Sequence, residues 1–194
     1  MKPFEEVLKP DPRNLYYGDL ACGTRITVRH RYAELSGVAL GPNVPVPIKD
    51  YFGTLQDLCL YGWYAYEFYG VAFFLSFTAI EMGLKIRLSK SPNDKRMLHE
   101  LLQEALKKKL ISPRGFTHIR GIRQTAARDL RRMRRFEGLR KSQLPKSDYL
   151  AILQKAIPRL RNAYAHPTAQ AIHLPHEAIF SLRFAAEFIN QLFP

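Results

Sequence analysis

The sequence predicts an all-α protein, a bundle of about five helices preceded by an irregular N-terminal arm. Apolar residues recur every three or four positions through most of the chain after residue 53, and prolines and glycines interrupt the first 52 residues. The 194 residues suffice for one domain with a hydrophobic core. We therefore divide the chain into an arm, residues 1–52, and a helical domain, residues 53–194.

The arm is expected to be mostly extended or irregular, because it holds six prolines and four glycines. Weak alternation over residues 24–28 is compatible with a short strand, and residues 29–36 are equally compatible with a helical turn. Valines alternate with prolines over residues 43–48, a pattern that predicts an extended segment.

The first two helices follow directly. One is expected over residues 54–89, with a bend near Gly70. The next begins at the turn around Asp94 and runs to Lys109, because apolar residues repeat along one face of this stretch.

Three more helices complete the expected bundle. Ser112 followed by proline is a start signal for a helix that reaches about residue 140. Residues 147–166 form the next one, which Pro158 should kink or restart and the following Pro167 should end. A closing helix is expected over residues 175–192.

The composition favours a cytoplasmic protein without a membrane span. Residues 58–80 are apolar and long enough to cross a bilayer, but Glu67 interrupts them and aromatic residues are spread throughout. The first ten residues do not resemble a signal peptide. Cys22 and Cys59 form no metal-binding or disulfide pattern, and no phosphate loop or other cofactor motif occurs, so we expect neither a metal nor a cofactor.

A basic segment dominates the charge of the chain. Residues 107–161 carry 17 Lys or Arg residues against three acidic ones, in a chain whose net charge is +13. At helical spacing, one stripe consists of Arg128, Arg131, Arg132 and Arg135. Most charge runs are solvated helix faces, but such faces usually mix signs, whereas this stripe is purely arginine, which binds phosphate through a planar fork. We expect it to bind a nucleic-acid backbone, although the pattern does not distinguish RNA from DNA.

The most informative string is residues 160–167, in which Arg161 and Asn162 precede His166 at the end of the fourth expected helix. This string resembles the HEPN superfamily, which is defined by an Arg, four to six residues and a His near a helix end, often with a polar residue directly after the Arg. Within the expected helices, the stretches 79–88, 98–110 and 175–192 resemble the first, second and closing helices of that family. The resemblance covers about residues 60–194 and leaves the arm outside it.

The resemblance implies a bundle that usually dimerises, with the two Arg–His motifs facing each other. Catalytic members cut RNA without a metal ion: the ribose 2′-hydroxyl attacks its own phosphate and leaves a 2′,3′-cyclic phosphate and a 5′-hydroxyl. We therefore expect a metal-independent endoribonuclease. The alternatives are a non-catalytic module that binds RNA or a nucleotide, and an interaction partner in a toxin–antitoxin or defence system.

Arg161, Asn162 and His166 are the catalytic candidates. An imidazole exchanges protons near neutral pH, and a helix C-terminus favours its charged form, so His166 suits a general acid. Arg161 can offer two donors to a phosphate, and Asn162, four residues before His166, can orient the imidazole. Arg161 and His166 lie about 140° apart around an ideal helix, so one site needs a long reach, a distorted helix end or a second subunit.

Two neighbours are further RNA-binding candidates. Arg159 shares the face of His166 better than Arg161 does and is a reserve phosphate ligand. Tyr164 can stack on a base, although a residue on its apolar stripe more often packs in the core.

A purely structural role for the motif is the main alternative. Under it, His166 caps the helix and Arg161 pairs with a carboxylate. Glu81 is a candidate carboxylate because it follows an almost uncharged run and should be partly buried; it can pair with Arg161, or with Lys85 four residues on.

A two-fold homodimer is expected on two grounds. The geometry of the motif favours a site shared between two copies, with each His166 near its symmetry mate in one basic cleft. The chain is also expected to carry more aromatic surface than one small bundle can hide, at Trp63, Tyr64, Tyr66 and Tyr69. RNA and a second copy are thus the expected partners, with room for another protein.

Overall fold

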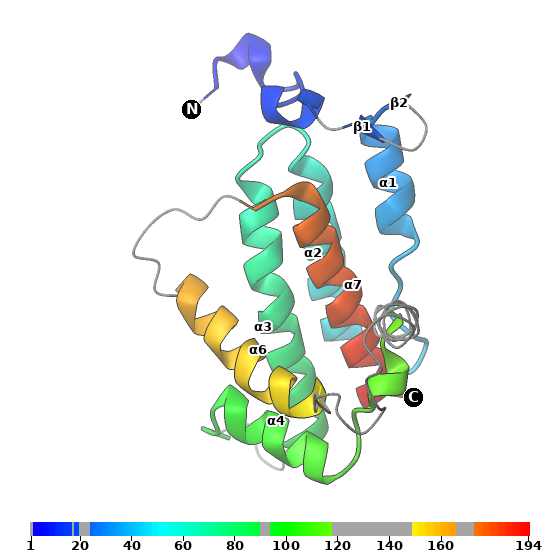
Figure 1. The fold of residues 1–194 in the computed structure, drawn as a ribbon, viewed down its shortest axis with the longest axis vertical. Coiled ribbons are helices and arrows are strands. Elements are labelled where there is room, and N and C mark those ends of the chain that lie inside the picture. The colour runs from blue at the N-terminus through cyan, green and yellow to red at the C-terminus, as the bar shows by residue number, and fades with distance from the viewer. Residues whose placement is uncertain (1, 17, 20–23, 90–93, 118–148, 166–172) are drawn as a thin grey trace, which may run out of the picture.

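A computed structural model of the chain describes residues 2–16, 18–19, 24–89, 94–117, 149–165 and 173–194. Within these residues the protein is an all-α bundle, as predicted (Figure 1). Its helices are α1 (Val28–Ser36), α2 (Val46–Tyr61), α3 (Phe68–Leu88), α4 (Leu98–Lys107), α6 (Tyr149–Ala165) and α7 (Pro175–Leu192). One antiparallel pair of two-residue strands, β1 (Gly18–Asp19) and β2 (Thr24–Arg25), precedes α1.

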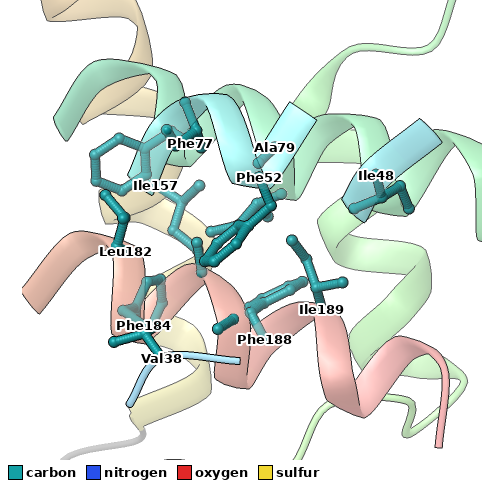
Figure 2. Packing of buried hydrophobic residues seen from close by; sticks show 14 of the residues in the cluster. Val38, Ile48, Phe52, Phe77, Ala79, Ile157, Leu182, Phe184, Phe188 and Ile189 are labelled. Carbon is teal, nitrogen blue, oxygen red and sulfur yellow. The ribbon is translucent and has the colours of Figure 1, made fainter. Parts of the chain in front are cut away.

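Helix α3 is the centre of the bundle. It packs against α2, α4, α6 and α7, and buried residues occur on every turn of its length (Figure 1). Figure 2 shows part of the core, in which aromatic and aliphatic side chains from α2, α3, α6 and α7 converge. The core is almost wholly apolar, but Ser76 of α3 and Ser181 of α7 form a buried hydrogen bond of 3.2 Å across the α3–α7 interface.

The first long helix is two helices, which corrects the prediction of one helix over residues 54–89. Helix α2 starts at Val46, so the expected extended segment over residues 43–48 is wrong at its end. Pro45 and Pro47 do not prevent this start, because the first amides of a helix have no partner within it. The boundary that we drew between residues 52 and 53 therefore falls inside α2.

Gly62 permits the turn between α2 and α3. A Cβ at this position would lie 2.7 Å from Cε1 of Tyr69, so only glycine lets the chain pass this close to the ring. Gly70, where we expected a bend, lies inside the continuous helix α3.

An N-terminal segment, residues 11–14, anchors the arm to this turn. The buried side chain of Asn14 donates hydrogen bonds to the carbonyl oxygens of Gly62 and Trp63, at 2.9 and 3.0 Å, and accepts one from the Tyr69 hydroxyl at 3.3 Å. Asp11 donates its backbone N–H to the Trp63 carbonyl. Farther along, α1 supplies Leu35 to the same core as the later helices.

The aromatic cluster at the start of α3 is buried within a single chain. Trp63, Tyr66 and Tyr69 are 5%, 3% and 0% exposed and Tyr64 is half-buried, so the expected aromatic surface is wrong and gives no support to a dimer. No helix in the described ranges combines the length and apolar composition that a membrane span requires.

The later helices match their predicted positions closely. Helix α6 runs unbroken through Pro158, where we expected a kink or a restart. Helix α7 starts at Pro175, and the Glu177 carboxylate accepts a hydrogen bond from the backbone N–H of Leu174, which caps the helix. Of the third predicted helix, the described residues show a short 3₁₀ turn at Pro113–Gly115 and a helical residue at Thr117, and residues 118–148 lie outside the described part.

Candidate functional site

Arg161 lies in the last turn but one of α6, facing α3. Its Nε is 3.3 Å from Oε2 of Glu81, and the two side chains are 32% and 13% exposed. Neither atom has a hydrogen bond within the described residues, so the contact is an ion pair without hydrogen-bond geometry. The packing of α6 against α3 thus brings together two residues that are far apart in the sequence.

The Glu81 carboxylate bridges two cations. Its other oxygen, Oε1, accepts from Nζ of Lys85 at 2.8 Å, one helical turn along α3. Both partners that the sequence suggested for Glu81 are therefore present. One terminal nitrogen of the guanidinium, Nη1, donates a hydrogen bond of 3.3 Å to Oδ1 of the neighbouring Asn162.

A small pocket of about 160 Å³ opens beside this pair. Its polar wall combines residues of α3, the segment before α4, the start of α4 and α6, namely Glu81, Lys85, Asp94, Lys95, Arg96, His99, Arg161 and Asn162. Lysine and arginine outnumber carboxylates on this wall, and the positive end of the α4 dipole lies there too. The pocket therefore suits an anion.

Arg96 forms the rigid edge of the pocket. Its guanidinium donates to both oxygens of Asp94, to Glu104 and to the Leu88 carbonyl at 3.0 Å. These hydrogen bonds hold the pKa of the Asp94 carboxyl below its usual range and raise the pKa of Arg96. The Arg96 guanidinium is thus occupied by hydrogen bonds within the protein. These bonds fix the segment that carries Lys95 at the pocket mouth.

The structure places the predicted site residues unevenly. Arg161 and Asn162 line the pocket, whereas Arg159 is exposed on α6 and is not part of the lining. His166 follows the last residue of α6 and lies outside the described residues, as does the side chain of Tyr164. The basic stripe, Arg128, Arg131, Arg132 and Arg135, also lies outside them.

Sequence reasoning missed Lys95 and His99 as pocket residues. His99 had no visible partner in the sequence, because only the packing of α4 beside α3 and α6 brings it near Arg161. The sequence did show a helix start near residue 94. The positive end of that helix was the only sign in the sequence that these residues could help to bind an anion. Across the described ranges, no group of three or more histidine, cysteine or carboxylate side chains is placed to hold a metal ion.

Comparison of the chain with protein-family models, with curated proteins and with solved structures finds no match.

Proposed function

We propose that the protein is a metal-independent endoribonuclease of the HEPN type, which cuts RNA to 2′,3′-cyclic phosphate and 5′-hydroxyl ends. The observation that supports this best is the position of Arg161. It is held by Glu81 at the edge of a cationic pocket, five residues before the histidine that completes the motif in the sequence.

In this proposal each motif residue has a separate task. The terminal nitrogens of Arg161 bind the scissile phosphate and the charge that it gains in the transition state. As the 2′-oxygen bonds to phosphorus, its proton passes to water, and the bond from phosphorus to the 5′-oxygen breaks. His166, as an imidazolium, donates a proton to that leaving oxygen, and Asn162 orients the imidazole.

The proposal includes a two-fold homodimer. With the aromatic cluster buried, the remaining reason is the spacing of the motif, since residues five apart on one helix lie about 140° from each other. A second copy would bring its own motif to the same phosphate, so that two arginines flank it while one imidazole acts. Size-exclusion chromatography with light scattering tests this part: a monomer at working concentration contradicts the shared site.

A non-catalytic RNA-binding module is the second candidate. One observation favours it: Arg161 already has a carboxylate partner in Glu81, which is the contact that a structural role of the motif requires. Such a module would use the pocket and the basic stripe to hold phosphates and leave the RNA intact. An interaction partner in a toxin–antitoxin or defence system would instead show no affinity for RNA at moderate salt.

The deciding experiment is incubation of the pure protein with single-stranded RNA in EDTA, with product ends identified by mass spectrometry. Cyclic-phosphate ends that disappear in His166→Ala and Arg161→Gln support the nuclease. Lys155→Gln is the matched control, because Lys155 is exposed on α6 and does not line the pocket. Intact RNA that still binds the protein supports the module, and cleavage that survives His166→Ala contradicts the proposed mechanism.

A further inference from the structure

A second and larger cavity, of about 630 Å³, lies at the other end of α3. Residues of α1, α3 and α7 and of the approach to α7 form its wall, chiefly Glu34, Phe73, His173, Glu177, Phe180 and Arg183. Its volume is in the range of cavities that bind small organic molecules. None of these residues belongs to the Arg161 pocket.

Aromatic side chains line this cavity. The rings of Phe73 and His173 are stacked, with centroids 4.3 Å apart and planes 13° from parallel. Phe180 is 47% exposed, on a helix whose other phenylalanines, Phe184 and Phe188, are buried in the core. An exposed ring in a cavity offers a flat apolar face to a planar ligand.

The exposed side of α7 carries an ordered set of groups. His176, Phe180 and Arg183 are spaced four and three residues apart, so they form one stripe, and all three are exposed. Each belongs to the cavity wall. The stripe thus places a cation one turn from an aromatic face.

Two carboxylates, Glu34 and Glu177, make this cavity chemically different from the cationic pocket beside Arg161. One oxygen of Glu34 is held by Arg31 at 3.0 Å, and one oxygen of Glu177 accepts from the Leu174 backbone at 2.9 Å, so both carboxylates are fixed by the chain itself. Carboxylates repel a phosphate but accept hydrogen bonds from ring and amino N–H groups. The cavity therefore suits the base of a nucleotide better than its phosphate.

We propose that this cavity binds a guanine base of single-stranded RNA. Guanine has two adjacent N–H donors on one edge, which a carboxylate can accept side by side, and two acceptors, O6 and N7, on another edge, which match an arginine. Phe180 supplies the stacking face. Adenine and the pyrimidines lack this combination of paired donors and paired acceptors.

The choice of ligand rests on the proposed RNA substrate, but the surface is separate from the proposed cleavage site. Phe73 and Glu81 lie on the same helix, about 12 Å apart along its axis. At the stacked spacing of about 3.4 Å per nucleotide, that distance corresponds to three or four nucleotides. A guanine in the cavity would thus fix which phosphate reaches Arg161 and give the nuclease a sequence preference.

The test uses the four nucleosides, which lack phosphate and so report on the cavity alone. Guanosine should bind the full-length protein in saturation-transfer NMR and calorimetry, and the other three should bind at least about tenfold more weakly. Phe180→Ser should weaken guanosine binding by about 5- to 150-fold, the usual range for loss of one stacking partner. Tyr61→Ser is the matched control, because Tyr61 is 54% exposed on α2 and does not line the cavity.

Each other outcome has a defined meaning. Equal binding of all four nucleosides overturns the guanine assignment, and no binding, or binding that Phe180→Ser leaves unchanged, overturns the cavity itself. If RNA is cleaved while guanosine does not bind, only the cavity proposal fails. If guanosine binds to a protein that neither binds nor cuts RNA, the cavity stands as a base site and the proposed nuclease function fails.

Discussion

Glu81 and Arg161 meet across the α3–α6 interface, where Oε2 of the carboxylate lies 3.3 Å from Nε of the guanidinium. The pair has a double significance. It contributes to the docking of α6 on α3, and it fixes the side chain of the arginine in the Arg–His motif. A structural role and the proposed functional role would thus depend on the same contact. A measurement that separates protein stability from RNA binding is needed to distinguish them.

Replacing Glu81 makes this separation. In Glu81→Gln we expect the free energy of unfolding to fall by about 1 to 3 kcal/mol, because a mostly buried charged partner is removed. We also expect RNA binding to weaken at temperatures where the variant is fully folded, since Arg161 is no longer held. Lys85→Gln removes the more exposed partner of the same carboxylate and should cost less than about 1 kcal/mol. Unchanged RNA binding in folded Glu81→Gln would make the pair purely structural.

The basic stripe, Arg128, Arg131, Arg132 and Arg135, should act through the phosphate backbone. Replacing the four residues with glutamine should weaken binding to unrelated RNA sequences about equally. It should also flatten the slope of log affinity against log salt by about 0.7 for each phosphate of a single strand that the protein no longer neutralises. Titrations at several salt concentrations measure both effects, and a strong reduction for one sequence only would contradict backbone binding.

Asn14 should matter more to stability than its place in the arm suggests. In Asn14→Leu the carbonyl oxygen of Gly62 loses its side-chain donor, and that of Trp63 keeps only the backbone N–H of Asp11, which should lower the free energy of unfolding by about 1 to 3 kcal/mol. Asn43→Leu is the control, because Asn43 is exposed and its side chain donates to the Pro194 carbonyl at the surface. Denaturant unfolding compares the two variants, and equal effects would show that residues 11–14 do not anchor the turn.

The Asp11–Arg13 pair should contribute to acid sensitivity. Hydrogen bonds from Arg13 hold the pKa of Asp11 below its ordinary value, so the unfolded chain binds this proton more tightly than the folded one. The stabilisation is therefore complete above about pH 4 and disappears as pH falls through the folded-state pKa. Unfolding curves of the wild type and of Asp11→Asn should differ at neutral pH and converge as the pH falls below the folded-state pKa of Asp11. A gap that stays constant over this range would contradict the assignment.

Cys59 should be unreactive in the folded protein. Burial raises the pKa of its thiol to about 12, and the side chain is 1% exposed. A thiol reagent added to Cys22→Ser at about pH 8 should therefore react only as fast as the protein unfolds, because the thiolate is the reactive form. Fast labelling under native conditions would show that the core around α2 opens locally.

The sequence was most informative where caps and periodicity agreed. The start of α7 at Pro175 was readable, because a proline suited to the first turn and a regular apolar face coincide. The division between α2 and α3 was not readable, because the apolar run continues through the turn and the close approach of Tyr69 to Gly62 is a tertiary feature. The prediction of an exposed aromatic cluster failed for the same reason: residues 11–14, far away in the sequence, help to cover it.

The candidate site was predictable in part. The motif indicated Arg161 and Asn162, and the isolated charge of Glu81 in an apolar helix indicated a partner for Arg161. Lys95 and His99 reach the pocket only through the packing of α4, which no local pattern encodes.

The hydrogen bond between Ser76 and Ser181 joins residues 105 positions apart in the sequence. It sits in the interface between α3 and α7, so the core is completed by the last of these helices to be synthesised. A nascent chain that ends before α7 still exposes the apolar side of α3 that α7 covers. The bundle therefore cannot complete its core during synthesis until α7 has been made. Before that point, the incomplete bundle exposes an apolar surface to which chaperones and other nascent chains can bind.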